Sequence, residues 1–148
     1  MIREEKLPDK ILDKIPGLVE QLKIENDLEI FYLYGSGAKN DLKPLSDLDF
    51  AVLLDLRSIQ KELFRRELDY RTLISTYLNT DEYDLIILNK APLRFVHSIL
   101  KEGKMLYYKN QMNFINFTEQ INYYYLDFKF YKSEFNKLFL EQLYKLYG

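Results

Sequence analysis

The last third of the chain carries the pattern that most restricts its fold. Large apolar residues recur there in alternating steps of three and four, at Phe114, Phe117, Ile121, Tyr124, Phe128, Tyr131, Phe135 and Leu138. This spacing places all of them on one side of an α-helix. A single helix over residues 111–147 would be about 55 Å long, whereas a compact domain of this size is about 40 Å across. The helix must therefore kink, split into a pair or project.

The preceding residues alternate between helical and strand-length patterns. Strands are predicted at 29–34, 48–54, 83–88 and 104–108. Helices are predicted at 11–22, 58–78 and 92–103. Pro16 and Gly17 should split or kink the first helix, and Ser58 is expected to be the N-cap of the second. This order predicts an α/β fold in one domain, residues 1–148, with a core at 1–106 and an aromatic helical tail at 107–148.

Acidic residues begin two of the predicted strands. Asp47 and Asp49 open the second strand and should point to the same face, about 7 Å apart at the backbone. Such like charges repel unless a cation joins them, and Mg²⁺ fits because it prefers oxygen ligands. Asp84 begins the third strand, and a third acid meeting the other two is the ligand set of two-metal transfer chemistry.

A glycine and a serine follow the first strand, where the chain must turn. Gly35 lets the backbone approach a phosphate because it has no side chain. Ser36 can add its hydroxyl at the start of a short helix, whose free amides favour anions. Lys39 and Lys43 follow within reach of a phosphate. For Lys43, the simpler interpretation is a charged side chain in a loop, surrounded by solvent. These residues predict a phosphate site next to the acids.

The pattern Gly35-Ser36-x10-Asp47-x-Asp49, with Asp84 as a third acid, resembles the polymerase β-like nucleotidyltransferase superfamily. The runs 33–39 and 46–52 are similar to its minimal (MNT) branch, commonly the antitoxins of HEPN–MNT toxin–antitoxin pairs. The resemblance implies a small mixed sheet flanked by helices, with a long C-terminal helix or helix pair. One departure is Lys39, where the branch usually has arginine; lysine keeps the charge but loses bidentate geometry.

The resemblance also implies an activity, the transfer of AMP from ATP to a tyrosine of the cognate HEPN ribonuclease toxin. The implied metal ligands, for two Mg²⁺ ions, are Asp47, Asp49 and Asp84. The implied ATP contacts are Gly35, Ser36 and Lys39. Asp84 would also help to deprotonate the attacking hydroxyl. Two alternatives stay open: a small-molecule nucleotidyltransferase, for instance one that modifies an aminoglycoside, and an antitoxin that acts by binding alone.

Composition narrows the chemistry and the partners. The chain has no cysteine and a single histidine, His97, so cysteine nucleophiles and multi-histidine metal sites are excluded. Its 21 basic and 23 acidic residues argue against broad binding of nucleic acid. The apolar runs are too short for a membrane, so a cytoplasmic protein is expected. The tail holds eight Tyr and six Phe; we expect it to bind the toxin or a second copy, as a homodimer.

Overall fold

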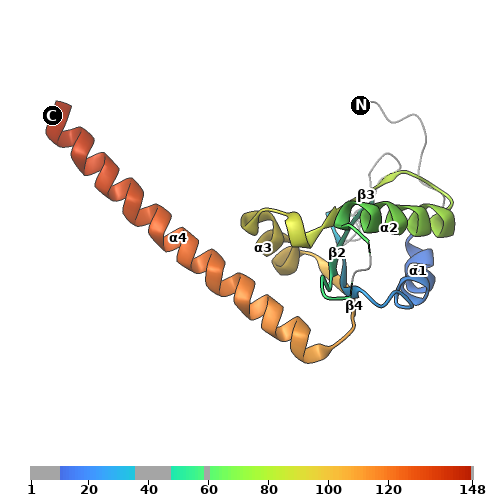
Figure 1. Cartoon of the computed structure of the whole chain (residues 1–148). Helices are drawn as coiled ribbons and strands as arrows, with labels where there is room; N and C mark the ends of the chain where they lie inside the picture. Colours follow the sequence, from blue (N-terminus) through green and yellow to red (C-terminus); the bar gives the residue numbers. More distant parts are fainter. Residues whose placement is uncertain (1–10, 36–47, 59–60, 148) are drawn as a thin grey trace.

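A four-stranded sheet lies at the centre of the computed structural model, which describes residues 11–35, 48–58 and 61–147 (Figure 1). Its strands are β1 (Leu28–Tyr34), β2 (Leu48–Leu54), β3 (Tyr83–Ile87) and β4 (Lys104–Tyr108). They lie in the order β3-β2-β1-β4. β1 pairs antiparallel with β2 and β4, and β2 pairs parallel with β3. The sheet is therefore mixed, as predicted.

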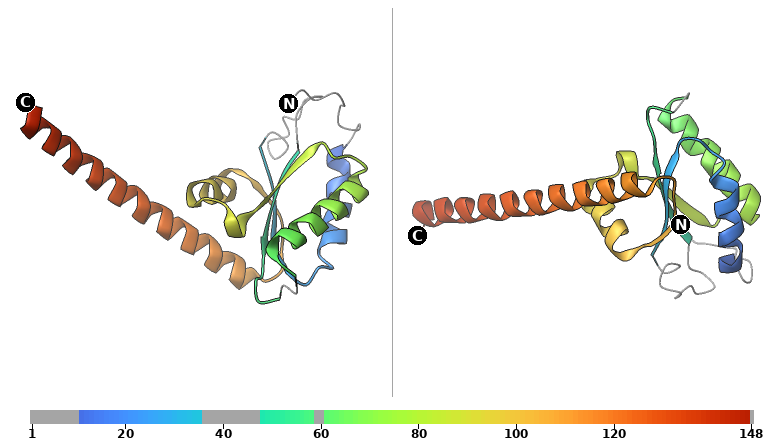
Figure 2. Two further views of the ribbon diagram at one scale, coloured as in Figure 1. Left: turned by 45° about the horizontal axis from the view of Figure 1, so that its top comes forward. Right: turned by 90° about the horizontal axis from the view of Figure 1, so that it is seen from below.

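Helices cover both faces of this sheet (Figure 2). One face carries α1 and α2, and the other carries α3 and the first turns of α4. The helical segments are η1 (Ile11–Lys14), α1 (Ile15–Leu22), α2 (Leu63–Leu78), η2 (Leu88–Lys90), α3 (Leu93–Glu102) and α4 (Gln111–Tyr147). This arrangement confirms the predicted α/β class and explains why the strands are apolar on both faces.

Alternate strand residues belong to two separate apolar clusters. Phe31, Phe50 and Leu85 are buried beneath α1 and α2, because side chains along a strand point to opposite faces in turn. Tyr32 and Ala51 are buried on the other face, against α3. The alternation also decides which face the polar residues at the strand ends occupy.

One helix start differs from the expectation, and the predicted break in the first helix is observed. The prediction that Ser58 is the N-cap of α2 is wrong, since α2 begins at Leu63. Ser58 instead belongs to the turn that follows β2, where its hydroxyl donates to Asp55 Oδ2 at 2.9 Å. The first helix divides at Ile15 into η1 and α1, and Pro16 occupies the first turn of α1, where its missing N–H costs nothing.

The C-terminal heptad pattern forms one uninterrupted helix, α4, which projects from the sheet (Figure 1). Its N-terminal part packs on the α3 side, through Phe114, Phe117 and Ile121 against the sheet and through Tyr125, which stacks on a ring of α3. Further along the same side, Tyr131 is 63% and Phe135 66% exposed. Of the three predicted outcomes, projection is the one observed. No helix in the described part of the chain is long and apolar enough to cross a membrane.

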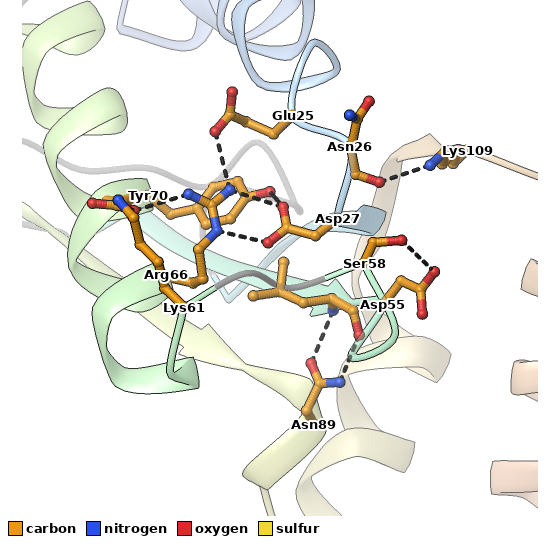
Figure 3. A network of polar contacts seen from close by, with 12 residues as sticks. Glu25, Asn26, Asp27, Asp55, Ser58, Lys61, Arg66, Tyr70, Asn89 and Lys109 are labelled. Carbon is orange, nitrogen blue, oxygen red and sulfur yellow. Dashed lines mark hydrogen bonds and ion pairs between the residues drawn. The ribbon is translucent and has the colours of Figure 1, made fainter.

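A buried ion-pair network ties α2 to the segment before β1 (Figure 3). Arg66 donates from Nε to Asp27 Oδ2 at 2.6 Å and from Nη2 to Asp27 Oδ1 at 2.9 Å, and the Tyr70 hydroxyl donates to Asp27 Oδ1 at 2.6 Å. Asp27 is only 3% exposed. Burial raises the pKa of Asp27, but the hydrogen bonds from Arg66 and Tyr70 outweigh it and hold the pKa below its usual value. The network lies before the start of β1, whereas Gly35 follows the end of that strand. We therefore assign the network to the stability of the fold.

Candidate active site

Asp49 and Asp84 lie side by side on neighbouring parallel strands. The two residues are paired directly in register across β2 and β3, which places their backbones about 4.8 Å apart. Their chain neighbours, among them Phe50 and Leu85, are buried beneath α1 and α2, so both acids project on the α3 side. Asp49 is half-buried and Asp84 is exposed. The pair is therefore open to a ligand from solvent.

Gly35 ends β1 directly beside Asp49. Its φ of +73° lies in the left-handed region that favours glycine. A Cβ built on Gly35 would overlap the Asp49 carboxylate. Glycine is thus required both by the turn and by the close approach of the carboxylate. The structure brings these two residues together, as the sequence predicts.

Tyr34 belongs to the same site, although the sequence reasoning did not single it out. It is paired in register with Asp49 across β1 and β2, and its ring meets Phe95 of α3 edge to face at 5.9 Å between centroids. Burial raises the pKa of the Tyr34 hydroxyl, and the charges of Asp49 and Asp84 raise it further. The hydroxyl therefore keeps its proton at neutral pH. The one feature of the sequence that could have indicated Tyr34 is its position directly before Gly35, fifteen residues before Asp49.

Four of the predicted residues, Ser36, Lys39, Lys43 and Asp47, lie outside the described residues. In the part of the chain that the structure describes, no group of three or more Asp, Glu, His or Cys side chains could hold a metal ion. The described part therefore contains two of the three predicted acids, already paired. His97, the single histidine, stacks on Tyr125 of α4 at 3.7 Å between ring centroids.

The donor chemistry of the acid pair fits a divalent metal ion. Asp49 and Asp84 offer carboxylate oxygens from two adjacent strands, and Mg²⁺ is commonly held by one or two carboxylates together with substrate phosphates. The backbone turn at Gly35, where no side chain intervenes, is a suitable place for a phosphate to approach. A mixed sheet that presents paired acids beside a glycine turn is an arrangement compatible with metal-assisted transfer of a phosphate group.

Comparison with known families supports this class. The family model described as Polymerase beta, Nucleotidyltransferase matches residues 17–112, which include every strand of the sheet and both described acids. Because the match spans more than half of the chain, the chain belongs to the polymerase beta nucleotidyltransferase family. The family and the enzyme class predicted from the Gly-Ser and acid pattern are thereby confirmed.

Individual relatives agree with the family. The protein adenylyltransferase MntA of Aphanizomenon flos-aquae (strain 2012/KM1/D3) is 26% identical over 121 residues, covering 74% of this chain and 81% of that protein. A toxin–antitoxin crystal structure with AMP-PNP superposes with a TM-score of 0.64 at 21% identity, covering 84% of this chain and 94% of that one. A tri-AMPylated Shewanella oneidensis HEPN toxin in complex with MNT antitoxin gives 0.62 at 18%, covering 86% and 96%. The two structures share the fold of this chain.

Proposed function

We propose that this protein transfers AMP from ATP to a tyrosine of a HEPN-type toxin, in a Mg²⁺-dependent reaction that silences the toxin. The observation that carries the proposal is the in-register pair of Asp49 and Asp84 beside the left-handed Gly35. The name of the MntA relative and the AMP-PNP and tri-AMPylated toxin structures support adenylyl transfer to a protein. The proposal treats residues 1–148 as one domain, with the catalytic core at 1–106.

Each proposed role follows from the chemistry of the side chain. Asp47, Asp49 and Asp84 would hold two Mg²⁺ ions, which neutralise the phosphates and stabilise the attacking and leaving oxygens. The oxygen of the acceptor tyrosine forms a bond to the α-phosphorus, and the bond from that phosphorus to pyrophosphate breaks. Asp84, the more exposed acid, accepts the proton of the tyrosine hydroxyl.

The remaining site residues would position the nucleotide. Gly35 and Ser36 would contact the phosphates through the backbone and a hydroxyl, and Lys39 would add a positive charge. Burial raises the pKa of Tyr34, so we expect its hydroxyl to stay protonated rather than to act as a base. Its protonated hydroxyl can instead donate a hydrogen bond at the acid pair. This division leaves proton removal to a carboxylate.

The exposed part of α4 is the proposed surface for the toxin. Its apolar side continues the row that packs on the core at Phe114, Phe117 and Ile121. Beyond them Tyr131 is 63% and Leu138 59% exposed, and an apolar surface this long on one helix is typical of an interaction site. The tail would thus hold the toxin while the acids modify it.

The direct test uses ATP labelled at the α-phosphate, Mg²⁺ and the protein encoded by the neighbouring reading frame as acceptor. The proposal predicts label on a tyrosine of that protein, located by mass spectrometry, and no label when EDTA removes the metal. Label on an aminoglycoside instead would favour the small-molecule alternative. A tight complex without any label would show that the protein acts by binding alone.

Magnesium with ATP is expected to raise the melting temperature of the protein. A ligand that binds only the native state at 100 times its Kd adds about 2.7 kcal/mol to the free energy of unfolding. For a chain of this length, that corresponds to a rise of roughly 5–10 °C in Tm. Thermal unfolding followed by circular dichroism measures the shift, with ATP plus EDTA as the control. An unchanged Tm at saturating Mg²⁺ and ATP would contradict nucleotide binding.

Replacing Phe135 by serine is expected to weaken toxin binding about thirtyfold, the loss typical of a buried aromatic anchor. Phe130→Ser is a matched control, because Phe130 is 59% and Phe135 66% exposed, while the two lie about 140° apart around the helix. Titration calorimetry with the toxin measures both variants. Equal losses in the two variants would show that the side of α4 continuous with the core is not the toxin surface.

A further inference from the structure

A basic hollow lies between the start of α3 and the middle of α4. Its volume is about 320 Å³, and its lining includes the cations Arg94, Lys129 and Lys132. Among the described residues that line it, none is acidic. None of these three cations forms an ion pair with another residue that the structure describes, in contrast to Arg66, which is held by carboxylates. The three charges are therefore available to an anion.

Aromatic and hydrogen-bonding side chains complete the wall of this hollow. Tyr125 and Phe128 contribute rings, and Ser133 and Asn136 contribute a hydroxyl and an amide. Tyr125 stacks on His97 with an angle of 9° between the rings, so its orientation is fixed by α3. Cations beside aromatic rings are the composition with which proteins bind short single-stranded nucleotide chains, since the cations meet phosphates and the rings stack on bases.

The hollow adjoins the candidate active site through α3. Phe95, the residue after Arg94, contacts Tyr34 edge to face, and Tyr34 is paired with Asp49. The start of α3 thus lies against the sheet face that carries the acids, while the middle of α4, beyond the turns that pack on the sheet, lies on the other side of α3 (Figure 2). A chain that leaves the active site along α3 would therefore meet the hollow without occupying the acid pair.

We propose that this hollow binds a short adenylate chain, linked by phosphodiesters and attached to the acceptor tyrosine after successive AMP transfers. In each transfer after the first, a ribose hydroxyl of the last AMP would form a bond to the α-phosphorus of a further ATP, its proton would pass to a carboxylate of the site, and pyrophosphate would leave. The proposal rests on the proposed function. One structural relative holds a tri-AMPylated toxin, and three AMP groups carry three phosphates, equal in number to the three cations of the hollow. An acidic peptide would meet the cations but would leave Tyr125 and Phe128 without bases to stack on, so the aromatic lining favours nucleotides.

Binding of a fluorescently labelled triadenylate to the full chain, measured by fluorescence polarisation in EDTA, tests the proposal. Combining Arg94→Gln, Lys129→Gln and Lys132→Gln should weaken binding at least about tenfold and lower the slope of log affinity against log salt by about two. The control combines Lys137→Gln with Lys145→Gln, which remove two exposed charges of α4 outside the hollow. It should bind as the wild type does. Equal binding by the triple variant and the wild type would overturn the proposal.

A second comparison separates nucleotides from acidic peptides. Phe128→Ala should weaken triadenylate binding about tenfold, because base stacking is lost, and a labelled hexaglutamate should bind the wild type far more weakly than triadenylate. Hexaglutamate that binds as tightly as triadenylate would assign the hollow to an acidic segment and overturn the proposal. Since this binding needs neither metal nor ATP, a failure of AMP transfer would count against the proposed function separately.

Discussion

Replacing Asp49 by asparagine is expected to lower the rate of AMP transfer about a thousandfold while the fold stays intact. Asparagine keeps the size of the side chain against Gly35 but removes the charge that would hold the metal, whose stabilisation of the transferring phosphate is worth several kcal/mol. The melting temperature should not fall, because the change also relieves repulsion between two carboxylates paired in register. Label transfer and thermal unfolding measure the two effects.

The control for this variant is Asp81→Asn, which removes an exposed acid just before β3. It should transfer AMP at the rate of the wild type, because Asp81 is not part of the acid pair. A large drop in the melting temperature of Asp49→Asn would instead give Asp49 a structural role. Activity close to that of the wild type would remove Asp49 from the catalytic site.

Replacing Asp27 by asparagine is expected to cost about 3 kcal/mol of unfolding free energy, the loss typical when one partner of a buried ion pair is removed. The change leaves Arg66 without its closest carboxylate and Tyr70 without its charged acceptor. For a chain of this length the melting temperature should fall by roughly 10 °C. The control is Arg57→Gln, which breaks an exposed ion pair with Asp55 and should leave the melting temperature unchanged.

Acid pH provides a second readout for the same variant. The folded pKa of Asp27 lies below its unfolded value of 3.8, so its carboxylate stabilises the native state above that pH. This contribution is lost as the pH falls through the lowered folded pKa. The difference in unfolding free energy between the wild type and Asp27→Asn should therefore have its largest value near neutral pH and become smaller below about pH 4. A difference that is the same at both pH values would contradict a charged Asp27.

Local patterns predicted most of the secondary structure, because the signals that end these elements are local. β1 ends where Gly35 must turn, and β2 spans the apolar run from Leu48 to Leu54. The start of α2 was missed because Ser58 belongs to the turn after β2, bonded to Asp55, and serine is favoured in turns as well as at helix starts. Heptad spacing predicted one apolar side of α4. Whether the helix projects depends on how much of that side can pack on the sheet, which the spacing does not determine.

The candidate site was predictable where strand alternation decides it. Two acids at the starts of neighbouring parallel strands had to share a face once β2 and β3 paired in register. Contacts between distant segments left no local signal. Arg66 reaches Asp27 across 39 positions, and the hollow joins Arg94 of α3 to lysines of α4. Such clusters arise only when helices are placed on the sheet.

The measurement that tests the central claim most directly is a double-mutant cycle of AMP transfer to the toxin with Asp49→Asn, Asp84→Asn and the combined variant. If the two carboxylates hold one metal-bound nucleotide, each single change should abolish most of the rate, and the double variant should be hardly slower than the slower single one. Losses that multiply, or an Asp84→Asn variant as fast as the wild type, would show that the paired acids do not form one catalytic site.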